Sequence, residues 1–203
     1  ELDGAGERVV CGGGRFLSRW GGAGPWVCWL GAAVAGLGCT AKLVKGLRGK
    51  RVGHPAPGQN RLGEWTAKLI RVGSLQLIVA VSEPTRFCVV VDAAPYAQLG
   101  FRLKERIFKA LLFIVVPADL AAEEAEAMEP IEIAASNSRS VLSTINQFAW
   151  YSEGYVRDGD VASASQLTER LAEMIVTSPK HIGMPVDRVR EAFGLPPIDR
   201  RRY

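Results

Sequence analysis

The chain of 203 residues is 48% hydrophobic and 23% charged, a composition ordinary for a globular protein that can bury a sizeable core. Its four cysteines and two histidines show no spacing typical of a zinc site, and no phosphate-loop motif is present, so we predict no metal and no cofactor. The net charge of +4 is unevenly distributed. Residues 38–110 carry 13 Lys or Arg against 4 acidic residues, whereas residues 111–132 carry 6 acidic residues and no basic one. The basic part can meet a polyanion, pair with the acidic part, or form a solvated surface.

Residues 1–37 differ in composition from the rest, with 10 of the 22 glycines and three of the five tryptophans. Glycine-rich sequence without periodicity does not readily offset its ordering entropy, so we predict a disordered extension or the product of a misassigned start codon. In the alternative, Arg15, Arg19 and the apolar stretch 25–38 form a secretory signal, and the protein is secreted through residues 15–38. The stretch is shorter than the ~20 residues that span a bilayer, so we predict no transmembrane segment. The cysteines have the pattern of reduced packing residues, which favours the cytoplasm.

The organised part begins with a short strand at residues 38–40 and a basic helix at residues 41–47, followed by a loop rich in Pro and Gly. Three strand-like runs come next, at residues 65–72, 75–81 and 86–92. Segments of turn composition join them, so we predict an antiparallel meander.

A long helix is predicted between Pro95 and Pro117, where the hydrophobic period changes to that of a helix. Its main apolar stripe consists of Leu99, Leu103, Ile107, Leu111 and Ile114. A second stripe, which widens the apolar face, consists of Phe101, Phe108, Leu112 and Val115. We therefore expect this helix to be the main cover of the sheet.

The pattern predicts a short helix rich in Ala and Glu at residues 118–128 and a strand at residues 130–135. It predicts a second long helix at residues 138–154. The remainder has helical periodicity. The predicted fold class is α+β: an antiparallel meander sheet covered by a long helix and several shorter helices, stacked largely on one sheet face, with a helical C-terminal region. We assign a single domain to residues 38–194 and a basic tail to residues 195–203.

The strongest candidate site is the junction between the last strand and the helix that follows it. If this helix begins near Asn137, its first N–H groups lack intrahelical partners and favour an anion. A guanidinium and two hydroxyls are available to hold that anion. The ligand-binding candidates here are Asn137, Ser138, Arg139, Ser140 and Asn146.

Four residues of this helix recur at spacings of four, three and four, and therefore lie on one face: Arg139, Ser143, Asn146 and Trp150. Such a polar ridge with an aromatic end can bind a phosphate or stack a nucleotide base. The alternative is structural. In it, Ser136 or Asn137 caps the helix, while Arg139 and Asn146 tie it to neighbouring carbonyls and carboxylates.

A second constellation precedes the first strand of the meander, where Glu64 and Trp65 follow Leu62 and Gly63. Glu64 is a weak candidate for a catalytic general base or for a partner of Arg139, and Trp65 for the wall of a ligand pocket. The alternative is a turn that enters the strand with a Trp packed in the core.

Three motifs together resemble an uncharacterised bacterial family catalogued as a domain of unknown function. They are Cys39-Thr40-Ala41-Lys42-Leu43, Leu62-Gly63-Glu64-Trp65-Thr66-Ala67-Lys68-Leu69 and Asn137-Ser138-Arg139-Ser140-Val141-Leu142. They match family patterns similar to CTKKL, LGxWxANL and TNSRSVLGSMND in the same order. Lys68 replaces an Asn of these patterns and Gln147 an Asp, and the lost Asp removes a carboxylate that a catalytic role can use. The resemblance implies domain boundaries near residues 38 and 193 but no reaction.

The leading hypothesis is a small cytoplasmic binding or interaction module whose polar helix N-terminus engages an anionic group on a ligand, a nucleic acid or a partner protein. One alternative is a small enzyme that acts on a phosphorylated or nucleotide substrate, with Glu64 as base and Arg139 as charge stabiliser. The other is a motif that is purely structural, with the function elsewhere on the surface. Whether the protein is an enzyme stays open at this level.

Overall fold

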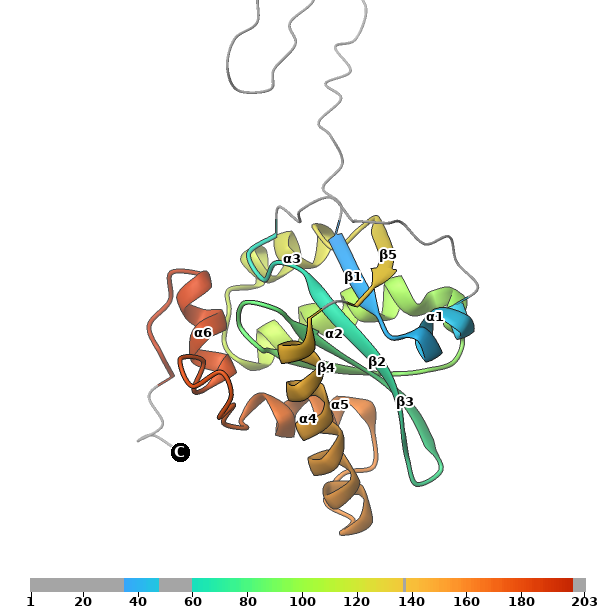
Figure 1. Cartoon of the computed structure of the whole chain (residues 1–203). Coiled ribbons are helices and arrows are strands. Elements are labelled where there is room, and N and C mark those ends of the chain that lie inside the picture. The colour runs from blue at the N-terminus through green and yellow to red at the C-terminus, as the bar shows by residue number, and fades with distance from the viewer. Residues whose placement is uncertain (1–34, 48–59, 137, 199–203) are drawn as a thin grey trace, which may run out of the picture. The chain divides into compact units, whose positions relative to one another are not determined.

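The computed structural model describes residues 35–47, 60–136 and 138–198. The predicted extension, apart from its last residues, the loop after residue 47, Asn137 and the last five residues of the tail lie outside the described residues. The strands are β1 (Ala35–Cys39), β2 (Trp65–Val72), β3 (Leu75–Ser82), β4 (Cys88–Asp92) and β5 (Ile131–Ala135). The helices are α1 (Ala41–Leu47), the 3-10 turn η1 (Tyr96–Gln98), α2 (Leu99–Phe113), α3 (Ala118–Glu126), α4 (Arg139–Arg157), α5 (Ala164–Ala172) and α6 (Pro185–Ala192), as Figure 1 shows.

The fold is α+β, with a five-stranded mixed sheet in the order β4-β3-β2-β1-β5. The antiparallel meander is confirmed for β2, β3 and β4. The prediction of an antiparallel sheet is otherwise wrong, because β1 pairs in parallel with both β2 and β5. Parallel neighbours need crossover connections, and here more than ninety residues separate β1 from its partner β5. A local sequence pattern therefore cannot indicate this pairing. Strand β1 also begins at Ala35, three residues before the predicted start.

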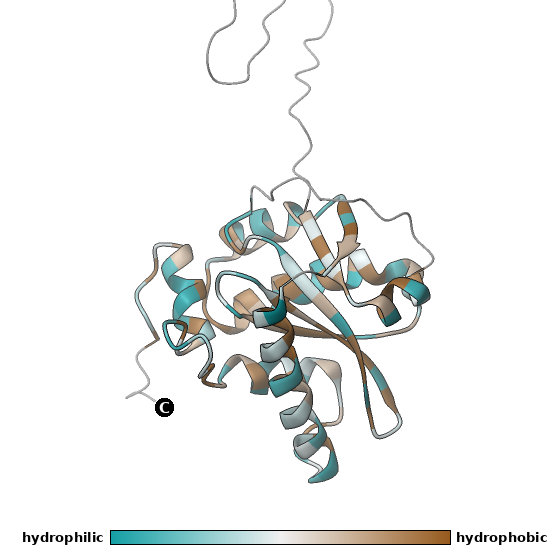
Figure 2. Ribbon diagram, viewed as in Figure 1, coloured by the Kyte–Doolittle hydropathy of each residue, from teal (hydrophilic) through white to brown (hydrophobic). Residues whose placement is uncertain are grey.

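Helices cover both faces of the sheet, which corrects the expectation that they stack largely on one face. On the first face, α2 packs with α1, α3 and α6 against alternate residues such as Trp65, Ile78 and Val89. On the second face, α4 and α5 cover the intervening residues, among them Leu77 and Val79. Strands β3 and β4 are hydrophobic along most of their length (Figure 2), as strands buried on both faces must be.

Helix α2 buries only one of its two predicted apolar stripes. Leu99, Leu103, Ile107 and Leu111 are buried against the sheet, as predicted. The second stripe widens this face only at Phe108, which packs partly buried against the first core, whereas Phe101 is 64% exposed, Leu112 39% and Val115 64%. The two stripes lie too far apart around the helix for one sheet to cover both, so the other three residues of the second stripe face solvent.

The acidic stretch of the chain forms α3 and partly neutralises its basic surroundings. Lys104 of α2 donates to Glu126 at 2.7 Å and to Glu129 at 3.2 Å. Glu124, only 3% exposed, accepts hydrogen bonds from the backbone N–H groups of Arg61 and Leu62. These contacts support the interpretation of the charge segregation as internal pairing for this part of the fold. In the described part of the chain, no helix combines the length and apolar character needed to cross a membrane.

Candidate functional site

The chain leaves β5 and crosses the face of β1 to reach α4, as Figure 1 shows. The Ser136 N–H donates to the Cys39 carbonyl at 3.1 Å, and a Cβ placed on Gly38 would lie 3.3 Å from the Ser136 Cα. Only a residue without a side chain allows this close approach without displacing the crossing segment. Cys39 of the first motif is therefore in direct contact with Ser136, two residues before Ser138 of the third motif.

Helix α4 begins at the predicted junction, with Ser138 as its N-cap. The Ser138 Oγ accepts a hydrogen bond from the Val141 N–H at 3.4 Å. The partial positive charge of this 19-residue helix is concentrated at its first N–H groups. Arg139 and Ser140, which begin the helix, are exposed. The observed cap therefore lies one residue after Asn137 and two after Ser136, the two residues predicted as caps. Asn137 itself lies outside the described residues.

Arg86, from the turn between β3 and β4, lies against the start of α4. Its guanidinium Nη2 donates to the Ser140 Oγ at 3.0 Å, although the residue is only 7% exposed. The buried Nε and Nη1 atoms have no hydrogen-bond partner among the described residues. Burial lowers the pKa of Arg86, and the negative charge of nearby Glu83 partly opposes this shift. Sequence reasoning missed Arg86, because a single Arg in a turn has no local pattern that distinguishes it from a solvated one.

The second motif joins the same region through Lys68 and Thr66 of β2. Lys68 Nζ donates to the Asn146 Oδ1 at 2.6 Å, which ties the second turn of α4 to the sheet. Thr66 Oγ1 donates to the Glu83 Oε1 at 3.3 Å. All three motifs therefore meet around the N-terminal half of α4.

The predicted polar ridge of α4 is confirmed as one exposed face. Arg139, Ser143, Asn146 and Trp150 are all exposed, and the Trp150 side chain is 69% exposed. Its ring makes an edge contact with Tyr151, with 5.0 Å between the ring centroids. The ridge runs from the start of α4 toward an open aromatic surface.

Two buried hydroxyls mark the carboxyl ends of the neighbouring parallel strands β1 and β5. Thr40 Oγ1 and Ser136 Oγ have no hydrogen-bond partner among the described residues. The helices that follow these strands pack on opposite faces of the sheet, since Leu43 of α1 belongs to the first core and Val141 of α4 to the second. In open sheets, ligands bind at such points, where successive connections leave in opposite directions.

A family model described as Domain of unknown function (DUF6933) matches residues 36–188. The chain belongs to this family. The match runs from β1 into α6, so the contacts around α4 all lie within the DUF6933 domain. No curated protein and no solved structure matches the chain.

Trp65, a proposed pocket wall of the DUF6933 domain, lies away from α4. The side chain is 1% exposed in the first core, on the sheet face opposite α4, and its Nε1 has no partner among the described residues. This placement supports the alternative in which Trp65 is a core residue. The segment that enters the strand is held by Glu124, as described above.

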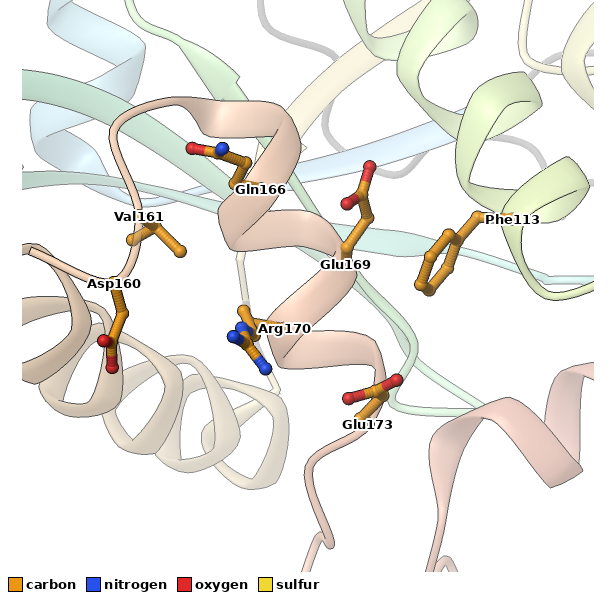
Figure 3. Close-up of a pocket in the computed structure, with 7 residues that line it drawn as sticks. All are labelled: Phe113, Asp160, Val161, Gln166, Glu169, Arg170 and Glu173. Atoms are coloured by element: carbon orange, nitrogen blue, oxygen red, sulfur yellow. The ribbon is translucent and has the colours of Figure 1, made fainter. Parts of the chain in front are cut away.

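The weak catalytic candidate Glu64 is exposed, and its carbonyl accepts a hydrogen bond from the Glu83 N–H at 2.8 Å. No contact between described residues joins its carboxylate to Arg139. A pocket of about 280 Å³ beside α5 (Figure 3) is lined by neither residue. Among the described residues, the geometry therefore gives the DUF6933 domain a polar, cationic surface at α4 and brings no catalytic pair of Glu64 and Arg139 together.

Proposed function

We propose that the DUF6933 domain is a binding module that holds an anionic group, such as a phosphate or carboxylate, at the N-terminus of α4. The observation that carries this proposal is the buried, incompletely paired guanidinium of Arg86. Ser138, Arg139 and Ser140 border the same position, as the sequence hypothesis requires. Asn146 lies farther along α4 and would contact the rest of the ligand rather than its anionic group.

A buried cation is costly unless an anion or several hydrogen bonds compensate it. Arg86 forms no ion pair within 4.0 Å in the described structure, and its guanidinium donates there to the neutral hydroxyl of Ser140. The positive end of α4 lies beside it and adds unfavourable potential. A bound anion would offset both effects at once, because it can accept from the guanidinium and from the first N–H groups of the helix.

The approach to this position is from the side of Ser140, which is exposed while most of the guanidinium is buried. A ligand that binds there can extend along the exposed ridge toward Asn146 and Trp150. The Lys68–Asn146 hydrogen bond holds that part of the ridge against the sheet, so the surface is ordered before a ligand arrives.

The test is thermal unfolding of the full chain in inorganic phosphate and in chloride at matched ionic strength. Phosphate should raise the melting temperature, with a stabilisation of about 2.7 kcal/mol at a concentration one hundred times the dissociation constant. Arg86→Met should abolish the phosphate effect and leave the stability in chloride unchanged or higher, because it removes a buried unpaired charge. Arg71→Met, at an exposed position of β2, is the matched control and should keep the full effect.

The opposite pattern would refute the proposal. If Arg86→Met lowers the stability equally in phosphate and in chloride, Arg86 is a structural residue and the anion site does not exist. If phosphate still stabilises Arg86→Met, the anion does not bind at this location.

We also infer a cytoplasmic location in a bacterial cell. The cytoplasmic location is supported by Cys39 and Cys88, which are buried and unpaired, as in proteins of reducing compartments. The bacterial origin rests on the resemblance of the three motifs. Fractionation of the native protein, with N-terminal sequencing of the recovered chain, tests this inference, and recovery from the secreted fraction would overturn it.

A further inference from the structure

We propose that an apolar groove between the C-terminal end of α2 and α6 docks a basic segment of another protein, with one large apolar side chain as its anchor. This surface is separate from the anion site at α4 and does not depend on it. The groove has a volume of about 530 Å³, within the range of pockets that enclose a side chain or a small ligand. It is lined by Phe113, Ile114, Val115, Glu173, Met184, Val186 and Ile198.

The rim of this groove exposes large apolar side chains that nothing in the described structure covers. Phe113 is 46% exposed and Val115 is 64% exposed. They continue the second stripe of α2, in which Leu112 is 39% exposed. A contiguous apolar patch beside a groove is typical of an interaction site, whereas single exposed apolar residues are not.

The groove is held in shape by one side chain, Arg190 of α6. Its Nη1 donates to the carbonyls of Ile114 at 2.8 Å and Val115 at 2.9 Å, and its Nε donates to the Pro196 carbonyl at 2.6 Å. The guanidinium therefore joins the end of α2, helix α6 and the segment after it. A surface fixed in this way loses little conformational entropy when a partner binds.

Val115 has a backbone φ of 60°, in the left-handed region. A glycine adopts this conformation freely, whereas a β-branched residue is strained there. The exposed methyl groups of Val115 recover little of this cost by burial in the free protein. An apolar partner would bury them, which gives the side chain a role that glycine cannot fill.

A second pocket adjoins the groove and determines which charge a binding partner needs. It shares Phe113 and Glu173 with the groove, and Figure 3 shows the Phe113 ring directed from α2 toward the α5 side of this pocket. Three carboxylates line it, from Asp160, Glu169 and Glu173, against the single guanidinium of Arg170. A segment that places an apolar side chain in the groove would set its neighbouring residues over this acidic surface.

Charge complementarity selects the occupant. A second copy of the chain in a two-fold contact would bring Glu169 and Glu173 close to their own symmetry mates, which is unfavourable. A nucleic acid would place phosphates against the same carboxylates. A protein segment with Lys or Arg beside a large apolar residue satisfies both the apolar groove and the acidic pocket.

The experiment is selection of a random displayed peptide library on the full chain, with counter-selection on the double variant Val115→Gly, Glu173→Lys. The selected peptides should share a large apolar or aromatic residue next to at least two basic residues. Synthesised binders should lose at least about fivefold in affinity toward Val115→Gly alone, and their affinity should fall with added salt. Val115→Gly removes backbone strain, so it tests the side chain without unfolding the protein. Glu153→Lys, exposed on α4, is the matched charge control and should bind normally.

Three results would overturn the proposal. The first is enrichment of acidic peptides, and the second is enrichment that the counter-selection variant does not reduce. The third is concentration-dependent dimerisation of the free chain in sedimentation that Phe113→Ala abolishes, because a second copy would then be the occupant.

Discussion

Glu124 is the buried carboxylate that orders the segment before β2, and removing it should destabilise the protein strongly. Its Oε2 accepts from the Arg61 N–H at 2.8 Å, and its Oε1 accepts from the Leu62 N–H at 3.0 Å and from Asn60 Nδ2 at 3.1 Å. In Glu124→Ala the Leu62 N–H becomes a buried donor without an acceptor, because Leu62 is fully buried. Such a group costs about 1–3 kcal/mol, and hydrogen bonds to a charged acceptor add a further contribution.

We expect Glu124→Ala to lower the free energy of unfolding by about 3 kcal/mol. A domain of this size changes its melting temperature by about 2–4 °C per kcal/mol, so the shift should be roughly 6–12 °C. The measurement is urea unfolding together with a thermal scan. Glu123→Ala is the control next in sequence. The Glu123 side chain is 67% exposed and forms a surface ion pair with Arg61, so the effect of this variant should stay below about 0.5 kcal/mol. Equal effects of the two variants would refute the argument that the buried acceptor holds this segment.

Two further predictions concern the sheet. The Thr168 Oγ1 of α5 accepts from the Val90 N–H at 2.9 Å, and its own proton has the Ala164 carbonyl at 2.9 Å as its nearer acceptor and the Val90 carbonyl at 3.3 Å as its farther one. Thr168→Val should therefore cost about 2 kcal/mol in urea unfolding by leaving the Val90 N–H at the edge of β4 without an acceptor, and a change below about 0.5 kcal/mol would contradict this. Burial raises the pKa of the Cys39 thiol from 9.0 to about 12, so its contribution to stability is complete below pH 9 and is lost as the pH rises toward 12. Between pH 9 and pH 11, wild type should therefore lose about 1.4 kcal/mol per pH unit relative to Cys39→Ala in urea unfolding, and parallel pH profiles of the two proteins would exclude this.

The features predictable from sequence are those that local patterns determine. The buried stripe of α2 follows from a helical period, and the meander of β2, β3 and β4 follows from three apolar runs with short turns between them. The pairing of β1 with β5 depends on contacts between distant segments, which no local pattern encodes. The covering of both sheet faces does have a local signal, because the continuous apolar runs of β3 and β4 indicate strands buried on both sides.

In the candidate site, too, the features that local patterns determine were predictable and those that depend on the tertiary fold were not. The start of α4 and its exposed ridge were predicted, because an N-cap residue and a four-three-four spacing are local features. Arg86 and the pairing of Lys68 with Asn146 could not be predicted, since the turn after β3 and the middle of β2 reach α4 only through the tertiary fold. Trp65 has a place in the core that its neighbours in sequence do not reveal.

The residues in and around the three motifs differ in how far the fold itself explains them. Leu62 and Trp65 fill the first core, and Gly38 makes room for the crossing segment, so packing accounts for their identities without any ligand. Packing does not account for Arg86, Thr40 and Ser136, because each carries a buried polar atom without a partner in the described structure. Natural proteins rarely leave such atoms unpaired, since each costs stability unless a water molecule or ligand completes it. These three residues adjoin the first and third motifs and the start of α4, so a ligand of the DUF6933 domain should be sought there first. The Nε1 of Trp65 is also buried without a partner in the described structure, but Trp65 lies on the opposite sheet face and therefore does not belong to this candidate site.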